Sequence, residues 1–457
     1  MNRPGPDDKR SVSYSFSLPY EWQLVQQGAA TVMQDHQSGH QRLTLSDVQR
    51  PEYLANPYPL YHRLREHDPI YWDEEMHAWV LTRYTDVVAV LRDPRFSSAW
   101  GPVETAWMPE ELRPQLEPAL RAVSRQMLFL DPPDHSRLRG LVARAFTPRM
   151  VESLRPRVQR LVDELLDAVQ DQGEMEFVAD FAYPLPAIVI AEMLGVPPED
   201  RSQFIVWTQD FGRLLDGGHL SFEELLTTLS GIADFLAYFR RQIAQRRTAP
   251  RDDLLQALIL AEEQGDRLNE EELLGNCVLL LAAGHGTTTH LLGNGLYALL
   301  QHPEQLQLLR ENPSLAPTAV MELLRYDSPV QLTSRRLTAD VEWAGRRFKA
   351  GEEVLTVLGA ANHDPEQFPD PDRLDLRRTD NRHVAFGHGP HFCLGAPLAR
   401  LEAEVAFTTI LRRLPQLCLA TEQIERLPSL VFRGIKALPV TFASVLPATG
   451  ATAAAED

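Results

Sequence analysis

Cys393 is a lone thiol placed among glycines, in a pattern that suits metal ligation. It lies in the run from Phe386 to Gly395, which contains three glycines. A helix start and nearby backbone N–H groups lower the pKa of a thiol, and Gly395 followed by Ala-Pro-Leu is typical of a loop entering a helix. Glycines also let the backbone approach a flat cofactor. The residues point to a thiolate on haem iron. The alternative, a buried cysteine in a turn, leaves the glycines unexplained.

The same run resembles the haem-binding signature of the cytochrome P-450 family. That signature is Phe, Gly, any, Gly, any, His, any, Cys, any, Gly, and every specified position is matched. The resemblance implies haem b as the cofactor, with Cys393 as axial ligand, Phe386 packed near the haem and His391 reaching a haem propionate. It also implies a mainly α fold with small β-sheets (α+β), in which haem lies between a long central helix and the helix that follows the cysteine loop.

Length and composition agree with a large enzyme. The 457 residues are 44% hydrophobic, and no internal repeat or linker interrupts them between about 45 and 445. We therefore expect an irregular N-terminal extension over 1–44, a single catalytic domain over 45–445 and a low-complexity tail over 446–457. The net charge of -18 argues against nucleic acid as a partner.

Cysteine usage and hydropathy bear on the compartment. The three cysteines are odd in number and far apart, so a disulfide framework is not expected. The first residues show no signal-peptide core and no apolar stretch that could cross a membrane. These features predict a cytoplasmic protein without a membrane anchor, which places the chain with the soluble bacterial type of the family. A monomer is the default expectation.

Helical periodicity dominates the chain, and one helix is exceptionally long. Asn269 is a good N-cap with Glu272 three residues later, and the pattern predicts a helix over 270–301. Further helices are expected over 60–67, 155–169, 222–247, 254–264, 317–326 and 397–414, and a β-hairpin from 70–72 and 78–82.

The middle of the long helix carries two glycines and three threonines, an unusual choice for a helix interior. Threonine hydroxyls can bond to a carbonyl one turn earlier, which favours a local widening where a small ligand could lie. The segment resembles the family's oxygen-binding helix, because Ala283, Gly284, Thr287 and Thr288 match its pattern. The resemblance implies a catalytic hydrogen bond from Thr287.

Gly286 stands where the family normally has an acid that helps to carry protons. One interpretation keeps oxygenase chemistry, with protons supplied by ordered water, His285 or a substrate hydroxyl. The other is unusual chemistry, such as peroxide-driven turnover or oxidative coupling. A haem-binding sensor without turnover is a further alternative.

Glu322 and Arg325 are three residues apart on one predicted helix, a spacing that by itself indicates only an exposed pair. Together with the downstream run Pro-Asp-Arg-Leu ending at Leu374, they resemble the family's Glu-any-any-Arg motif and its third arginine, here Arg373. Leu374 replaces the more usual aromatic residue. The resemblance implies a buried network that supports folding.

A buried haem carries two propionates, which need cationic or strong hydrogen-bond donors. His135 and Arg139 share one helical face and match the family's His-any-any-any-Arg pattern, and Arg335 matches its strand arginine. The neighbouring Arg336 should point to the opposite side of that strand. With His391, these three residues form the predicted propionate set.

Seven arginines against one acid lie between 137 and 160. We expect this basic segment to dock an acidic ferredoxin-type partner, with Arg144 and Arg149 foremost. A solvated helical face is the alternative. The resemblance implies O2 as co-substrate and electrons from NAD(P)H through a reductase and ferredoxin.

The segments that line the family's substrate pocket are mostly apolar. Ala283, Leu332 and Val431, together with Trp100 and Trp107, indicate a sizeable hydrophobic substrate, such as a secondary metabolite or a lipid-like compound. Terpenoid, polyketide, fatty acid and peptide substrates all remain open.

Overall fold

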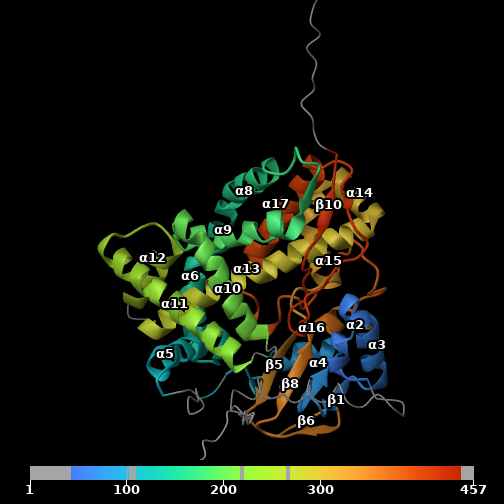
Figure 1. Ribbon diagram of the computed structural model, residues 1–457. Coiled ribbons are helices and arrows are strands. Elements are labelled where there is room, and N and C mark those ends of the chain that lie inside the picture. The colour runs from blue at the N-terminus through green and yellow to red at the C-terminus, as the bar shows by residue number, and fades with distance from the viewer. Residues whose placement is uncertain (1–42, 100, 102–109, 217–220, 264–267, 444–457) are drawn as a thin grey trace, which may run out of the picture.

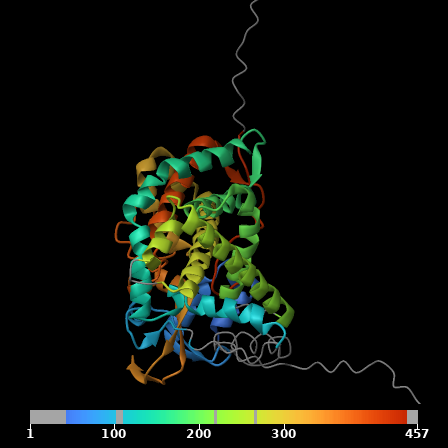
Figure 2. The same cartoon turned by 90° about the vertical axis from the view of Figure 1, so that its left-hand side faces the viewer.

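The computed structural model describes residues 43–99, 101, 110–216, 221–263 and 268–443. A large helical body occupies one side of the molecule, and a smaller region built around a β-sheet occupies the other (Figure 1). The view turned by 90° shows the helices stacked above this sheet region (Figure 2). The mainly α architecture with small sheets is as predicted.

The helix α13 (Glu270–Gln301) runs through the helical body and packs against helices on several sides of it (Figure 1). Its start is fixed by the predicted capping box. The Glu272 N–H donates to Asn269 Oδ1 at 2.9 Å, and the Asn269 N–H donates to a Glu272 carboxylate oxygen at 2.8 Å. Two otherwise unpaired donors of the first turn are thereby satisfied. The predicted bounds of this helix are confirmed.

Eleven further helices build the body around α13. They are α5 (Arg113–Ser124), α6 (Asp134–Ala145), α7 (Pro148–Ser153), α8 (Arg155–Asp167), α9 (Pro184–Met193), α10 (Arg201–Asp216), α11 (Phe222–Thr248), α12 (Leu254–Glu263), α14 (Pro303–Glu311), α15 (Ala316–Tyr326) and α17 (Ala396–Arg413). Short helical turns are η1 (Leu45–Gln49), η2 (Met127–Phe129), η3 (Val178–Ala182), η4 (Pro198–Asp200), η5 (Pro313–Leu315) and η6 (Gly389–His391). All the helices predicted from periodicity are present, with ends that agree to within two residues.

The main sheet has five strands in the order β1-β2-β8-β5-β3. The predicted hairpin is β1 and β2, and β2 then pairs parallel with β8. Its strands are β1 (Ile70–Asp73), β2 (Ala78–Leu81), β3 (Phe96–Ser97), β5 (Leu332–Leu337) and β8 (Glu353–Val357). The flanking helices are α2 (Pro51–Ala55), α3 (Tyr58–His67), α4 (Tyr84–Val90) and α16 (Leu358–Asn362). Smaller sheets contain β4 (Glu174–Glu176), β9 (Cys418–Leu419) and β10 (Pro439–Thr441), and separately β6 (Val341–Trp343) and β7 (Arg346–Phe348).

Several sequence expectations lie partly outside the described residues. These include most of the predicted N-terminal extension, the tail, Trp100 and Trp107. The proposed domain limits therefore stay predictions. Within the described part of the chain, no helix combines the length and the apolar character that crossing a bilayer requires.

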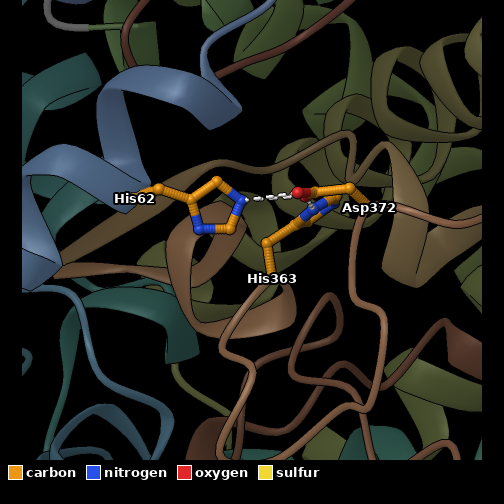
Figure 3. A group of neighbouring side chains, drawn as sticks. All are labelled: His62, His363 and Asp372. Atoms are coloured by element: carbon orange, nitrogen blue, oxygen red, sulfur yellow. Dashed lines mark hydrogen bonds and ion pairs between the residues drawn. The ribbon is translucent and has the colours of Figure 1, made fainter.

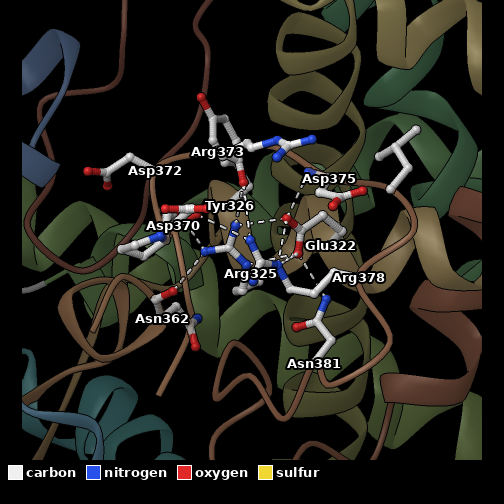
Figure 4. Close-up of polar contacts among 12 residues, drawn as sticks. Glu322, Arg325, Tyr326, Asn362, Asp370, Asp372, Arg373, Asp375, Arg378 and Asn381 are labelled. Carbon is white, nitrogen blue, oxygen red and sulfur yellow. Dashed lines mark hydrogen bonds and ion pairs between the residues drawn. The ribbon is translucent and has the colours of Figure 1, made fainter. Parts of the chain in front are cut away.

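Glu322 and Arg325 on α15 form a fully buried ion pair. The Arg325 guanidinium donates to both Glu322 carboxylate oxygens at 2.8 Å. Its remaining N–H groups donate to the carbonyls of Asn362 and Pro371 at 2.9 and 2.7 Å. The Asn362 side chain in turn accepts the Val384 N–H at 2.7 Å. The pair thus connects α15 to the segment that leads into the cysteine loop (Figure 4).

The assignment of Arg373 as the third guanidinium of this network was wrong. The Arg373 side chain is exposed, and only its carbonyl takes part, accepting a bond from Arg325 at 3.2 Å. Arg378 supplies the third guanidinium, with its Nε 3.2 Å from the Glu322 carboxylate (Figure 4). The reason lies in the loop that carries both residues. At Arg373 the loop turns its backbone carbonyl toward Arg325, and at Arg378 it turns the side chain toward Glu322.

Candidate functional site

A cavity of about 1780 Å³ lies between α13 and the loop that carries Cys393. Its walls come from α13, α10, β5, the segment from Leu427 to Phe432 and the run from Ala385 to Leu398. Most of the predicted site residues line this single cavity. They are His135, Arg139, Ala283, Thr287, Leu332, Arg335, Phe386, His391, Cys393 and Val431.

Backbone geometry positions Cys393 in the cavity wall. Its N–H donates to the Phe386 carbonyl at 2.9 Å, which closes the loop just before α17 begins at Ala396. Gly387 and Gly389 adopt φ of 69° and 71°, and a Cβ at Gly389 would lie 2.4 Å from the Leu91 carbonyl oxygen. Only glycine tolerates both requirements at Gly389. The predicted loop-to-helix passage is confirmed.

The electrostatics of the thiol differ from the expectation of a low pKa. Burial raises the pKa of Cys393, while the N–H groups of Gly395 and Ala396 and the positive charge of Arg139 oppose that rise. Desolvation outweighs the helix start here, because the sulfur is enclosed by protein on most sides. Two backbone N–H donors and the positive charge of Arg139 still stabilise the anion that a metal ion would bind.

Four cationic or potentially cationic residues converge on one edge of the cavity. The rings of His135 and His391 lie 4.0 Å apart between centroids. Arg139 donates to the carbonyl of Phe392 at 2.6 Å, and the buried Arg335 on β5 donates from Nη1 to Thr333 Oγ1 at 2.9 Å and to the Ser334 carbonyl at 2.6 Å. Burial lowers the pKa of His391 to about 3, with the charges of His135, Arg335 and Arg139 acting in the same direction. The pKa of His135 is also lowered, first by burial.

This edge is suited to an anion. His135 Nδ1 is buried and has no hydrogen-bond partner, and the acid beside it, Asp131, accepts bonds from Ser97 and from the Ser98 N–H. Besides burial, the charges of Arg139 and Arg335 lower the pKa values of both histidines, so a bound dianion at this edge would be stabilised by the two guanidinium groups and by the imidazole N–H groups. A haem fits both features, because Cys393 would supply a ligand to its iron and this edge would supply donors to its two propionates. Arg336 lies outside this cavity lining, as its place on β5 predicts.

The glycine- and threonine-rich segment of α13 faces the same cavity. Thr287 Oγ1 donates to the Ala283 carbonyl at 2.9 Å, and Thr289 Oγ1 donates to the His285 carbonyl at 3.2 Å. The predicted bonds to the preceding turn are therefore present, while the helix continues as regular α-helix instead of widening. Because its proton is donated, the Thr287 oxygen keeps its lone pairs for a group in the cavity.

Gly286 borders open space. A Cβ built on this residue meets no atom within 4 Å, so a side chain could extend there without a clash. At Gly284, by contrast, a Cβ would already lie 3.2 Å from Ile190. The missing acid at 286 is thus not replaced by another side chain close to the same point.

His285 is tied to α10. Its Nδ1 lies 3.0 Å from Thr208 Oγ1, its ring packs edge-on against Tyr183 at 4.2 Å, and Tyr183 accepts a bond from Gln209 at 2.8 Å. Burial lowers the pKa of His285 to about 4. Sequence reasoning missed Tyr183, Thr208 and Gln209, because no pattern along the chain connects α9, α10 and α13.

The basic segment between 137 and 160 is less basic in three dimensions than in sequence. Arg137 pairs with Glu272 at 2.6 Å, Arg155 with Glu152 at 2.6 Å, and Arg157 with Glu192 at 2.8 Å. Arg144 and Arg149 lie exposed on α6 and α7. Glu272 and Glu192, which come from distant segments, therefore offset part of the local charge excess.

Comparison with known proteins extends these observations. Residues 213–433 match the family model described as Cytochrome P450. Cytochrome P450 CYP107DY1 of Priestia megaterium is 42% identical, with 88% of this chain and 100% of that protein covered. Cytochrome P450 monooxygenase PikC of Streptomyces venezuelae is 44% identical, over 85% of this chain and 92% of that protein. A crystal structure of P450BioI with hexadec-9Z-enoic acid ligated acyl carrier protein has a TM-score of 0.79 and 42% identity, over 86% of this chain and 100% of that one.

Proposed function

The chain belongs to the cytochrome P450 family of monooxygenases, and we propose that its cavity holds haem b through Cys393 and oxidises a sizeable, mainly apolar molecule. The observation that carries this proposal is the pairing of one partly buried cysteine with an edge of two arginines and two histidines in the same cavity. His135, Arg139, Arg335 and His391 would hold the propionates, and Phe386 would pack near the ring. When bound, haem supplies the chemistry that activates O2 for insertion of one oxygen atom.

A spectrum of the reduced protein with carbon monoxide tests the ligand. A thiolate gives a red-shifted band that histidine ligation does not. We expect Cys393→Ser to lose this band, while Cys418→Ser, at an exposed position, keeps it. A band unchanged in Cys393→Ser would contradict the proposed ligation.

The residues of this chain prepare the site in three ways. The Gly395 and Ala396 N–H groups and Arg139 stabilise negative charge on the Cys393 sulfur. Arg139 also holds the Phe392 carbonyl, which orients the loop. Thr287 offers its lone pairs to the cavity because its proton is bound to the Ala283 carbonyl.

The open space beside Gly286 bears on which group delivers protons to the site. His285 is neutral near pH 7, since its pKa lies near 4, and its Nδ1 is engaged by Thr208. It is therefore a poor proton donor. We propose that ordered water or a hydroxyl of the substrate occupies the open space and carries the proton instead.

A specific observation also favours a second chemistry, peroxide-driven turnover or oxidative coupling. It is the open space beside Gly286 where an acid would extend. Product formation with a surrogate ferredoxin system, with peroxide alone and with neither distinguishes the two. Under oxygenase chemistry, Gly286→Glu should raise the fraction of electrons that reach product. Gly286→Gln is the matched control, since it adds similar bulk without the carboxylate. If the same fraction of electrons reached product in both variants, the carboxylate would not be responsible for the change.

The substrate is proposed to be lipid-like or a secondary metabolite. Ala283, Leu332 and Val431 line an extensive apolar surface, and the relative P450BioI was solved with a fatty acyl chain on its carrier protein. Titration of the haem protein with free fatty acids, carrier-linked acyl chains and steroids, read as a spin-state shift, separates these classes. No shift with any apolar ligand would contradict the proposal.

Electrons are proposed to come from NAD(P)H through a reductase and an acidic ferredoxin that docks near Arg144 and Arg149. Both arginines are exposed, and α6 also carries Arg139, which contacts the cysteine loop. Electrostatic attraction of this kind raises the association rate more than the affinity.

A further inference from the structure

Two histidines and an aspartate meet outside the cavity, where α3 packs against the loop that follows α16 (Figure 3). His62 Nε2 lies 2.8 Å and 2.9 Å from the two Asp372 carboxylate oxygens. His363 Nδ1 lies 2.8 Å from Asp372 Oδ1. None of the three residues lines the cavity described above. The cluster therefore has no part in the proposed oxidation.

His363 faces hydrogen-bond acceptors with both of its ring nitrogens. Its Nε2 lies 2.9 Å from the Tyr326 carbonyl oxygen, which can only accept, so Nε2 must carry a proton. The neutral ring then has a lone pair on Nδ1, and this lone pair points at the Asp372 carboxylate. Two acceptors, His363 Nδ1 and the Asp372 carboxylate oxygen, then face each other at 2.8 Å, and a proton or a cation must lie between them.

A second proton on His363 is a costly solution. The side chain is 1% exposed, and burial disfavours the imidazolium form. The charged groups facing it are mixed, with Arg325 nearby as well as Asp372. The Tyr58 ring stacks on His363 at 3.7 Å and keeps Nδ1 aimed at the carboxylate.

We propose that His62, His363 and Asp372 bind a divalent cation of the zinc type. Two imidazole nitrogens and one carboxylate oxygen form a usual ligand set for zinc, and the fourth position is left to water. The bond from His363 to the Tyr326 carbonyl is the outer contact that normally orients a histidine ligand. Ligands of a tetrahedral zinc ion lie about 3.3 Å apart at the usual bond lengths. The three ligand atoms lie within 4.8 Å of one another, and Asp372, whose side chain is 62% exposed, is free to adjust toward this spacing.

Arg65 limits the affinity of this site. In the absence of a cation, its guanidinium donates to His62 Nδ1, which puts the His62 proton on Nε2. Cation binding moves that proton to Nδ1 and turns this donor of Arg65 away. Arg65 keeps its bonds to the Ala360 and His363 carbonyls, at 3.0 Å each. We expect weaker binding than at a closed, four-ligand zinc site.

A bound cation would join α3 to the loop that supports the Glu322–Arg325 pair. Asp372 is the immediate neighbour of Pro371, whose carbonyl accepts from Arg325. The Tyr326 carbonyl belongs to the residue after Arg325. The expected role is therefore structural, and its readout is stability and metal content.

The test uses the haem-loaded full chain, treated with EDTA and then dialysed against micromolar ZnCl2. His62→Gln and Asp372→Asn remove the two partly exposed ligands, and His67→Gln is a matched control at an exposed position on the same helix. We expect the unaltered protein and His67→Gln to retain one zinc ion more per chain than the two ligand variants. Zinc should also raise the Tm of the unaltered protein and of His67→Gln, and it should leave the Tm of the two ligand variants unchanged.

Equal zinc content in all four proteins would overturn the proposal. A Tm increase of the same size in Asp372→Asn and in the unaltered protein would do so as well, since a cation held elsewhere would then be responsible. Haem absorbance measured on the same samples shows that the variants are folded. The result does not depend on the identity of the substrate or of the electron donor.

Discussion

Two buried clusters of charge in this protein differ in whether they are complete. The Glu322–Arg325 pair is matched, because the carboxylate accepts from Arg325, Arg378, Asn381 and the Asp375 N–H. At the edge of the cavity formed by His135, Arg139, Arg335 and His391, His135 Nδ1 has no hydrogen-bond partner, and burial and the charges of Arg139 and Arg335 lower the pKa of His135. The first cluster stabilises the fold by itself, whereas the second has a polar atom that an anionic ligand would complete. A buried polar atom left without a partner beside a cavity is therefore the better indicator of a binding site.

The largest effect is expected from the matched cluster. Arg325→Ala leaves the Glu322 carboxylate buried without its main partner, and we expect a loss of about 3 to 5 kcal/mol in the free energy of unfolding. Urea unfolding monitored by circular dichroism measures this loss. Arg373→Ala is the control, because that side chain is exposed, and its change should stay within about 0.5 kcal/mol. A large effect at Arg373 instead would restore the network predicted from sequence.

Glu402 is a buried acid that belongs to neither of these two clusters. Its Oε2 lacks a partner, and burial raises its pKa to about 8 from an ordinary value of 4.5. The native state holds this proton more tightly than the unfolded state, so the contribution to stability is full below pH 4.5 and is lost as the pH rises through about 8. The loss is about 5 kcal/mol at most.

Glu402→Gln should flatten that dependence. Unfolding free energies at pH 5, 6.5 and 8, measured on the variant and the unaltered protein, test the sign. Identical slopes would show that Glu402 is ionised in the folded chain. Asp380, whose ion pair with Arg382 is exposed, provides a control site for an acid-to-amide substitution.

The edge of the cavity should respond in the opposite manner. Arg335→Gln removes a charge that adds to the effect of burial in lowering the pKa values of His135 and His391, and it keeps a polar side chain that can still donate, so the unfolding free energy of the cofactor-free chain should change by less than about 1 kcal/mol. Haem affinity should fall about 10- to 100-fold, as expected for a lost charge-assisted hydrogen bond. Arg336→Gln is the matched control on the other side of β5. Haem transfer to apomyoglobin measures the loss, and unchanged retention in Arg335→Gln would separate this residue from the propionate set.

The smallest effect is expected at the surface. Charge reversal at Arg144 and Arg149 should slow reduction by an acidic ferredoxin at low salt and leave the unfolding free energy within about 0.5 kcal/mol. The difference should disappear as salt is raised. Stopped-flow reduction at two ionic strengths measures it. A rate that is unaffected at low salt would rule out docking at this face.

Local patterns anticipated the elements well but not all of their interactions. The capping box at Asn269 and the hairpin beginning at Ile70 depend on neighbouring residues, so they could be predicted. The Arg373 assignment failed because a loop decides which of two nearby arginines turns inward. The charge excess between 137 and 160 is partly offset by Glu192 and Glu272, which come from other helices and so could not be paired with it from sequence.

The sequence by itself determined the thiol in its glycine loop, the long capped helix and the missing acid at 286, because each is a matter of residue type at short range. Only the tertiary structure decided that the cations of α6, β5 and the cysteine loop share one edge, and that Gly286 borders open space. It also brought His62 to His363 and Asp372. These groups lie far apart along the chain, and their proximity follows from how helices and loops pack around a common core.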